Sequence, residues 1–181
     1  MKHLIVMTLA VLGLAAPAAN AALNVLTCEP EWAALTQELA GDLAEVDSAT
    51  TALQDPHRIQ ARPSLLAKAR RADLLICTGA ELEAGWLPLL QREAGNARIQ
   101  PGQSGYLEAA RFARIIERPR ALDRAQGDVH ASGNPHVHLD PRNIARVADG
   151  LARRLADLDP ANAARYAQRN TDFQSRWTAA M

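Results

Sequence analysis

A short apolar run at residues 72–78, Ala-Asp-Leu-Leu-Ile-Cys-Thr, most narrowly limits how this chain folds. A run of this length that is stopped by a glycine, here Gly79, is typical of a strand buried on both faces of a parallel sheet. Residues 23–28 form a second such run, and apolar residues at helical spacing follow both. This alternation continues through the first hundred residues. It predicts a three-layer α/β lobe, in which helices cover a parallel sheet of about four strands.

Prolines, glycines and apolar spacing mark the ends of the predicted elements. Asp140 is a good N-cap for a helix that begins at Pro141, and a further helix starts at Asp159-Pro160. We therefore expect residues 22–140 to form the lobe and residues 141–181 to form a helical hairpin. Residues 103–134 have little periodicity, which is typical of a functional loop. The predicted strands are 23–28, 43–52, 72–78 and 97–100, and the predicted helices before residue 103 are 30–41, 63–71 and 81–93.

The first 21 residues have the pattern of a secretory signal peptide. Lys2 precedes an apolar run at residues 4–14, and Ala19-Asn20-Ala21 is a small-x-small cleavage signal. The run is too short for a permanent membrane helix, and no later segment is apolar enough for one. Cleavage after Ala21 leaves 160 residues with 19 basic and 20 acidic side chains. This balance gives no reason to expect nucleic acid or an anionic membrane as partner. We expect an exported, periplasmic protein that does not itself span the membrane.

The chain has two cysteines, Cys28 and Cys77, each near the carboxyl end of a predicted strand. An oxidising compartment permits a disulfide between them, but a link between adjacent parallel strands is geometrically demanding. Of the two readings, two small buried thiols are favoured over a disulfide. A thiolate metal site is disfavoured because neither cysteine belongs to a Cys-x-x-Cys motif.

Histidines gather in residues 127–143, Gly-Asp-Val-His-Ala-Ser-Gly-Asn-Pro-His-Val-His-Leu-Asp-Pro-Arg-Asn. The prolines at 135 and 141 favour an extended backbone between them. In an extended segment His136 and His138 point to the same side, as a chelating pair requires. His57 follows the second predicted strand and so falls at the carboxyl edge of the sheet, where ligands of such folds bind. Three imidazoles predict a transition-metal site, with zinc as the expected ion.

Simpler explanations exist for each of these residues. A histidine after Asp-Pro is most often an ordinary loop residue, and His-x-His in a proline-rich turn is common. Asp55 or Asp140 would complete or orient the metal shell, although helix capping by itself explains Asp140. His130 lies on the approach to the site, where it captures metal only transiently.

Several motifs occur together and in order. They are NVLTCEPEW at residues 24–32, DPHRIQARPSLLAKARRADLLICTGAELEAGWLPLL at 55–90, NPHVHLDPRNIARVADGLARRL at 134–155 and DPANAARYAQR at 159–169. In this order and spacing the chain resembles the zinc- and manganese-specific solute-binding proteins of bacterial ABC importers. The resemblance covers nearly all of the chain after residue 21.

The resemblance implies two α/β lobes joined by a long helix, with the metal in the cleft between them. The first lobe of such proteins supplies two histidines, which correspond to His57 and His136. The chain stops at Met181, within or just after the position of the connecting helix, so we expect only the first lobe here. His138 stands where many relatives carry an aromatic residue, and the long acidic and histidine-rich loop of many zinc-type members is shortened. Imidazole ligands still favour zinc over manganese.

The expected function is therefore capture of the ion and its delivery to an ABC permease in the inner membrane. No catalytic residue and no organic cofactor is expected. Two other readings stay open. One is a truncated or stand-alone periplasmic metal chaperone. The other is a small zinc hydrolase, in which three histidines leave a fourth position for a water molecule.

Overall fold

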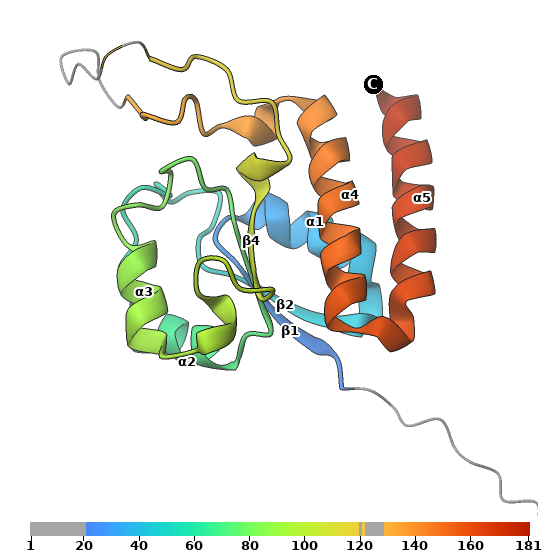
Figure 1. Cartoon of the computed structure of the whole chain (residues 1–181), viewed down its shortest axis with the longest axis horizontal. Helices are drawn as coiled ribbons and strands as arrows, with labels where there is room; N and C mark the ends of the chain where they lie inside the picture. Colours follow the sequence, from blue (N-terminus) through green and yellow to red (C-terminus); the bar gives the residue numbers. More distant parts are fainter. Residues whose placement is uncertain (1–20, 120, 122–128) are drawn as a thin grey trace, which may run out of the picture.

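A four-stranded parallel sheet forms the centre of the molecule (Figure 1). This computed structural model describes residues 21–119, 121 and 129–181, so Asp128 and the predicted signal peptide, except for Ala21, lie outside the described residues. The strands lie in the order β2-β1-β3-β4. Thr27 at the end of β1 pairs with Ser48 of β2 on one side and Ile76 of β3 on the other. The strands are β1 (Leu23–Thr27), β2 (Ala44–Ser48), β3 (Leu74–Cys77) and β4 (Tyr106–Glu108).

Helices cover both faces of the sheet, which confirms the predicted three-layer α/β fold. One face carries α1 (Pro30–Ala40), α4 (Pro141–Leu158) and α5 (Ala163–Ala180), whose apolar side chains pack with Val25, Leu74 and Ile76. The other face carries α2 (Pro63–Arg71) and α3 (Leu87–Ala94), which pack with Leu26 and Leu75. Alternate residues of β1 and β3 thus belong to opposite cores, as the period of a strand requires. The two C-terminal helices run side by side (Figure 1).

Local sequence signals place most of the helix starts correctly. Proline stands at the beginning of α1, α2 and α4, where its fixed φ suits a helix and its missing N–H is not needed. The side chain of Asp140 accepts a hydrogen bond of 2.9 Å from the backbone N–H of Arg142. This contact confirms Asp140 as the N-cap of α4.

The predicted fourth strand at residues 97–100 is wrong. Residues Ala97–Ile99 form a 3-10 turn, because the side chain of Asn96 accepts from the backbone N–H of Arg98 and caps it. The fourth strand is instead β4, which enters the sheet after the carbonyl oxygen of Gly105 accepts a hydrogen bond of 2.8 Å from Leu75 N–H. A Cβ on Gly105 would lie 2.6–2.7 Å from backbone oxygens, so a glycine is required for this close approach.

Among the other elements predicted before residue 97, two differ from the structure by more than two residues at one end. The strand predicted at 43–52 covers only Ala44–Ser48, because a 3-10 turn at Gly41–Leu43 precedes it and a loop follows. The helix predicted at 81–93 begins only at Leu87. Ala80 and Glu81 have positive φ angles of 50° and 72°, which a right-handed helix excludes. α3 begins at Leu87, and Pro88 lies in its first turn, where the missing N–H of a proline is not needed.

Among the described residues, no helix is both long and apolar enough to cross a membrane.

Candidate metal centre

His57 lies in the loop that follows β2 and is held in a tight turn by Asp55. One carboxylate oxygen of Asp55 accepts from both the backbone N–H and the Nδ1–H of His57, at 3.0 and 2.8 Å. The hydrogen bond from His57 lowers the pKa of Asp55, which stays ionised. The Nδ1–H contact assigns the tautomer, so Nε2 carries the lone pair that a metal ion needs. The backbone oxygen of Pro56 accepts from Trp86 Nε1 at 2.7 Å and ties the turn to the lobe.

His136 sits in a turn of the same construction, 79 positions further along the chain. The side-chain oxygen of Asn134 accepts from the backbone N–H and the Nδ1–H of His136, at 3.0 and 2.9 Å. The same tautomer follows, with the lone pair on Nε2. The ring centroids of His57 and His136 are 6.4 Å apart.

Asp55 and Asn134 therefore act as orienting residues for the two imidazoles. Sequence reasoning assigned Asp55 only loosely and passed over Asn134. The signal was present as a repeated pattern, Asp-Pro-His at 55–57 and Asn-Pro-His at 134–136. In each case an Asx side chain precedes a proline, and the histidine two positions on donates to it. Partners of this kind fix the ring of a metal-binding histidine.

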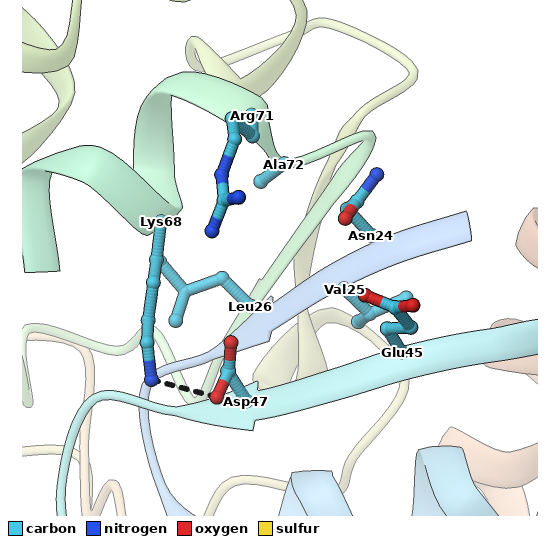
Figure 2. Close-up of a pocket in the computed structure, with 8 residues that line it drawn as sticks. All are labelled: Asn24, Val25, Leu26, Glu45, Asp47, Lys68, Arg71 and Ala72. Atoms are coloured by element: carbon cyan, nitrogen blue, oxygen red, sulfur yellow. Dashed lines mark hydrogen bonds and ion pairs between the residues drawn. The ribbon is translucent and has the colours of Figure 1, made fainter. Parts of the chain in front are cut away.

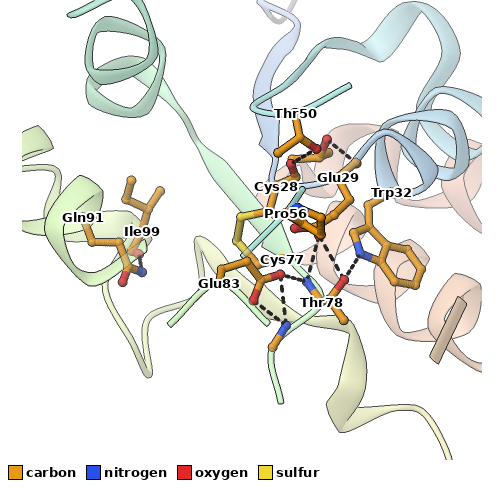
Figure 3. Close-up of a disulfide and its surroundings, with 12 residues drawn as sticks. Cys28, Glu29, Trp32, Thr50, Pro56, Cys77, Thr78, Glu83, Gln91 and Ile99 are labelled. Carbon is orange, nitrogen blue, oxygen red and sulfur yellow. Dashed lines mark hydrogen bonds between the residues drawn. A yellow bond between two sulfur atoms is a disulfide. The ribbon is translucent and has the colours of Figure 1, made fainter. Parts of the chain in front are cut away.

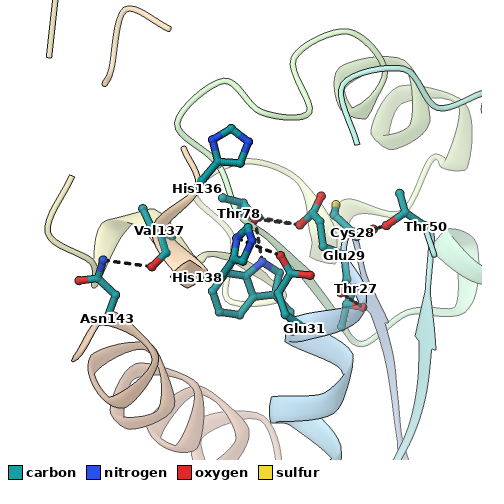
Figure 4. Close-up of polar contacts among 12 residues, drawn as sticks. Thr27, Cys28, Glu29, Glu31, Thr50, Thr78, His136, Val137, His138 and Asn143 are labelled. Atoms are coloured by element: carbon teal, nitrogen blue, oxygen red, sulfur yellow. Dashed lines mark hydrogen bonds and ion pairs between the residues drawn. The ribbon is translucent and has the colours of Figure 1, made fainter. Parts of the chain in front are cut away.

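The predicted extended backbone around His138 is wrong. Residues Val137–Leu139 form a 3-10 turn, and Val137 is buried in the main core. His138 consequently points toward α1, where its Nδ1 lies 3.2 Å from a carboxylate oxygen of Glu31 (Figure 4). The rings of His136 and His138 are neighbours, with centroids 6.2 Å apart and planes at 63°.

The ring of His130 lies closer to that of His57 than the ring of His136 does. The Nε2 atoms of His57 and His130 are 3.3 Å apart, and the rings are stacked with centroids 5.3 Å apart. Sequence patterns do not predict this approach, because the two residues are separated by 73 positions.

The cysteines form a disulfide, so the favoured reading of two thiols is wrong (Figure 3). Cys28 follows the last paired residue of β1, and its N–H donates to the carbonyl oxygen of Ile76. It therefore faces Cys77 at the end of β3, with the Cα atoms 4.8 Å apart, and both side chains lie on the α2–α3 face. This distance is within the range that disulfides require.

Two buried glutamates lie beside the disulfide and meet at Thr78 (Figure 3). Thr78 N–H donates to Glu29 at 3.2 Å and to Glu83 at 2.7 Å, and Gly79 N–H donates to the other oxygen of Glu83 at 3.1 Å. Burial, then the charge of Glu83, raise the pKa of Glu29 to about 10, and burial raises the pKa of Glu83 as well. Because Glu83 accepts from two backbone N–H groups, it is the ionised member, and Glu29 holds the proton.

A small hollow between β1, β2 and α2 lies away from the histidines (Figure 2). It has a volume of about 30 Å³, and Lys68 and Asp47 form an ion pair of 2.6 Å at its edge. A space of this size holds little more than a water molecule. The candidate site is therefore the group of histidines.

The sequence of residues 25–181 matches the family model described as zinc-uptake complex component A, periplasmic. The chain belongs to this family. Among the curated relatives, the high-affinity zinc uptake system protein ZnuA of Paracoccus denitrificans is 32% identical, over 87% of this chain and 55% of that protein. The manganese ABC transporter substrate-binding lipoprotein ScaA of Streptococcus gordonii is 26% identical, over 98% of this chain and 58% of that protein.

Solved structures share the fold of this chain. A crystal structure of ZnuA has a TM-score of 0.71 and 24% identity, and the match covers 87% of this chain and 55% of that one. A manganese-bound periplasmic metal-binding protein of Candidatus Liberibacter asiaticus has a TM-score of 0.67 and 22% identity, over 84% of this chain and 52% of that one. The chain spans about half the length of the curated relatives it matches.

Proposed function

We propose that this chain is the metal-binding lobe of a periplasmic solute-binding protein, which captures a divalent transition-metal ion and delivers it to the permease of an ABC importer. The observation that carries the proposal is the pair of matching turns at residues 55–57 and 134–136. Each turn uses Nδ1–H internally and presents Nε2 of its histidine, and the two rings lie 6.4 Å apart. Family membership supports the same assignment.

Zinc is the ion we propose, with His57, His136 and His138 as its ligands in this lobe. Neutral imidazole suits zinc better than manganese, which prefers carboxylate, carbonyl and water oxygens. His57 and His136 are the stronger ligands in this proposal, because an Asx side chain orients each ring. His138 lies at the edge of the group, next to Glu31. We propose no catalytic residue, since Asp55 and Asp140, the carboxylates next to the histidines in sequence, serve as hydrogen-bond partners in a turn and a helix cap.

The compartment is part of the same proposal. Residues 1–21 are proposed as a signal peptide removed after Ala21, and residues 22–140 as the metal-binding lobe that residues 141–181 extend. Intact-mass measurement of the exported protein tests the cleavage position. A mass that includes residues 1–21 would contradict it.

Removing either oriented histidine is expected to weaken zinc binding strongly. Loss of an orienting partner of a metal ligand costs 10–100-fold in affinity, so loss of the ligand in His57→Ala or His136→Ala should cost about 100-fold or more. His138→Ala should cost less, about tenfold, because no Asx side chain orients its ring. Competition titration of the purified chain against a zinc chelator gives the dissociation constants.

Leu139→Ala is the matched control for these variants. Leu139 is 74% exposed and adjoins His138, and it offers no metal ligand. It should bind zinc as the parent does, and circular dichroism should show that all variants are folded. Zinc affinities of His57→Ala and His136→Ala equal to that of the parent would refute the proposal. A higher affinity for manganese than for zinc would refute the choice of metal.

A further inference from the structure

We propose that His130 is a ligand of the same ion as His57, so that these two histidines form the closest chelating pair of the site. The assignment rests on the proposed function and extends it to a residue that the turns at 55–57 and 134–136 do not include. The carrying observation is the separation of 3.3 Å between His57 Nε2 and His130 Nε2.

This separation suits a shared metal ion. Two imidazole nitrogens at 2.0–2.1 Å from a tetrahedral zinc ion lie about 3.3 Å from each other. The observed pair is therefore spaced as ligands of one ion are, with Nε2 of each ring turned toward the other. The same separation also brings the two nitrogens within hydrogen-bond reach of each other, so the cobalt(II) spectrum distinguishes a shared ion from a hydrogen bond.

The orientation of His57 contributes to the same arrangement. Asp55 accepts from Nδ1–H of His57, which leaves the lone pair of the ring on Nε2, the atom that faces His130. A carboxylate, a histidine and a metal ion in this order form a common unit in metalloproteins, in which the carboxylate also raises the basicity of the ligand.

Glu81 holds the segment that carries His130. Its two carboxylate oxygens accept from the backbone N–H of Ala131 at 2.9 Å and from the hydroxyl of Ser132 at 3.2 Å. Glu81 itself has a φ of 72°, a strained value for a side chain of this size that persists only where the surroundings enforce it. Because Glu81 lies four residues after the end of β3, it ties His130 to the carboxyl edge of the sheet. We assign Glu81 as a positioning residue.

A common hollow connects His130 with the second oriented histidine. Its volume is about 380 Å³, and both His130 and His136 line it. His57 contacts the rings of both, with centroids 5.3 and 6.4 Å away. His57, His130 and His136 thus surround one region, whereas His138 is turned toward Glu31.

The test is a titration of the purified chain with zinc and with cobalt(II), whose visible absorption depends on the number and geometry of its ligands. His130→Ala should weaken zinc binding about 10–100-fold and change the cobalt spectrum. Glu81→Ala should weaken binding in the same direction by a smaller factor and change the spectrum likewise. Glu81→Gln should restore both toward the parent, because an amide can accept from Ala131 N–H and donate to the Ser132 hydroxyl.

Glu45→Gln controls for the loss of one negative charge, since Glu45 is exposed on β2 and lies away from the histidines. It should leave affinity and spectrum unchanged. If His130→Ala kept the parent's affinity and cobalt spectrum while His57→Ala lost affinity, the role of His130 would be overturned and the proposed function would stand. If the parent chain bound neither metal, both would fall.

Discussion

Replacing Cys28 and Cys77 together with alanine is expected to lower the free energy of unfolding by about 4 kcal/mol. The disulfide joins residues 49 positions apart, and a covalent loop of that length removes about this much conformational freedom from the unfolded chain. The bond also ties the ends of β1 and β3 together beside the loops that carry His57 and Glu81. Urea unfolding of the parent and the double variant measures the difference.

Reducing the disulfide of the parent protein separates the contribution of loop closure to stability from that of core packing. Dithiothreitol opens the disulfide but leaves both sulfur atoms in the core, so no cavity forms. The reduced parent should therefore lose most of the roughly 4 kcal/mol that the disulfide contributes to the free energy of unfolding. The double variant should not respond to dithiothreitol, because the described residues contain no other cysteine. Equal urea midpoints for the oxidised and the reduced parent would show that the disulfide does not stabilise the fold.

The buried pair of Glu29 and Glu83 is expected to make the protein less stable as pH rises above 4.5. The pKa of Glu29 is about 10 in the folded protein, against an ordinary value of 4.5. Below pH 4.5 the group is protonated in both states and has no effect. Between pH 4.5 and 10 the unfolded chain loses this proton and the folded protein keeps it, which lowers the free energy of unfolding. At pH 7 this cost amounts to about 3 kcal/mol.

Two substitutions of equal size should change stability in opposite directions. Glu29→Gln resembles the protonated acid and keeps an oxygen for the N–H and hydroxyl of Thr78. It should raise the free energy of unfolding by up to about 3 kcal/mol at pH 7 and flatten its dependence on pH. Glu83→Gln loses one of the two oxygens that accept from Thr78 and Gly79. At pH 5 it should destabilise the fold by about 1–3 kcal/mol.

Urea unfolding at pH 5, 7 and 9 compares the parent with both variants. The parent should have its highest midpoint at pH 5 and its lowest at pH 9. A midpoint that rises with pH in the parent, or a Glu29→Gln variant less stable than the parent at pH 7, would show that Glu29 is ionised in the folded protein.

Local sequence patterns predicted the fold class correctly. They predicted some ends of helices and strands correctly and others wrongly. Pro30, Pro63 and Pro141 set helix starts through a rigid φ, which is a property of the residue itself. The fourth strand was misplaced, because the choice between residues 97–100 and 106–108 depends on which segment reaches the edge of β3. Gly105 permits that approach and Asn96 ends the alternative in a turn. Gly105 acts through contacts with residues distant in sequence. Asn96 acts through one particular side-chain geometry.

The histidines also show that local preferences and tertiary contacts decide different features of the structure. A preference for extended backbone before Pro141 predicted that His136 and His138 share a side, but burial of Val137 and the hydrogen bonds to Asn134 favour a turn there. For the cysteines, the pairing of β1 with β3 decides whether a disulfide forms. Cys28 lies beyond the last paired residue of β1 and there faces Cys77.

The sequence by itself determined the α/β alternation, the helix starts and the types of ligand side chain available, because these depend on neighbours within one turn or one strand. Only the tertiary structure decided which histidines meet. His57 and His130 approach to 3.3 Å across 73 positions, and Glu81 holds the second of them from the end of a different strand. Such contacts arise from the packing of loops on one edge of a sheet, and no local preference encodes a distance between loops.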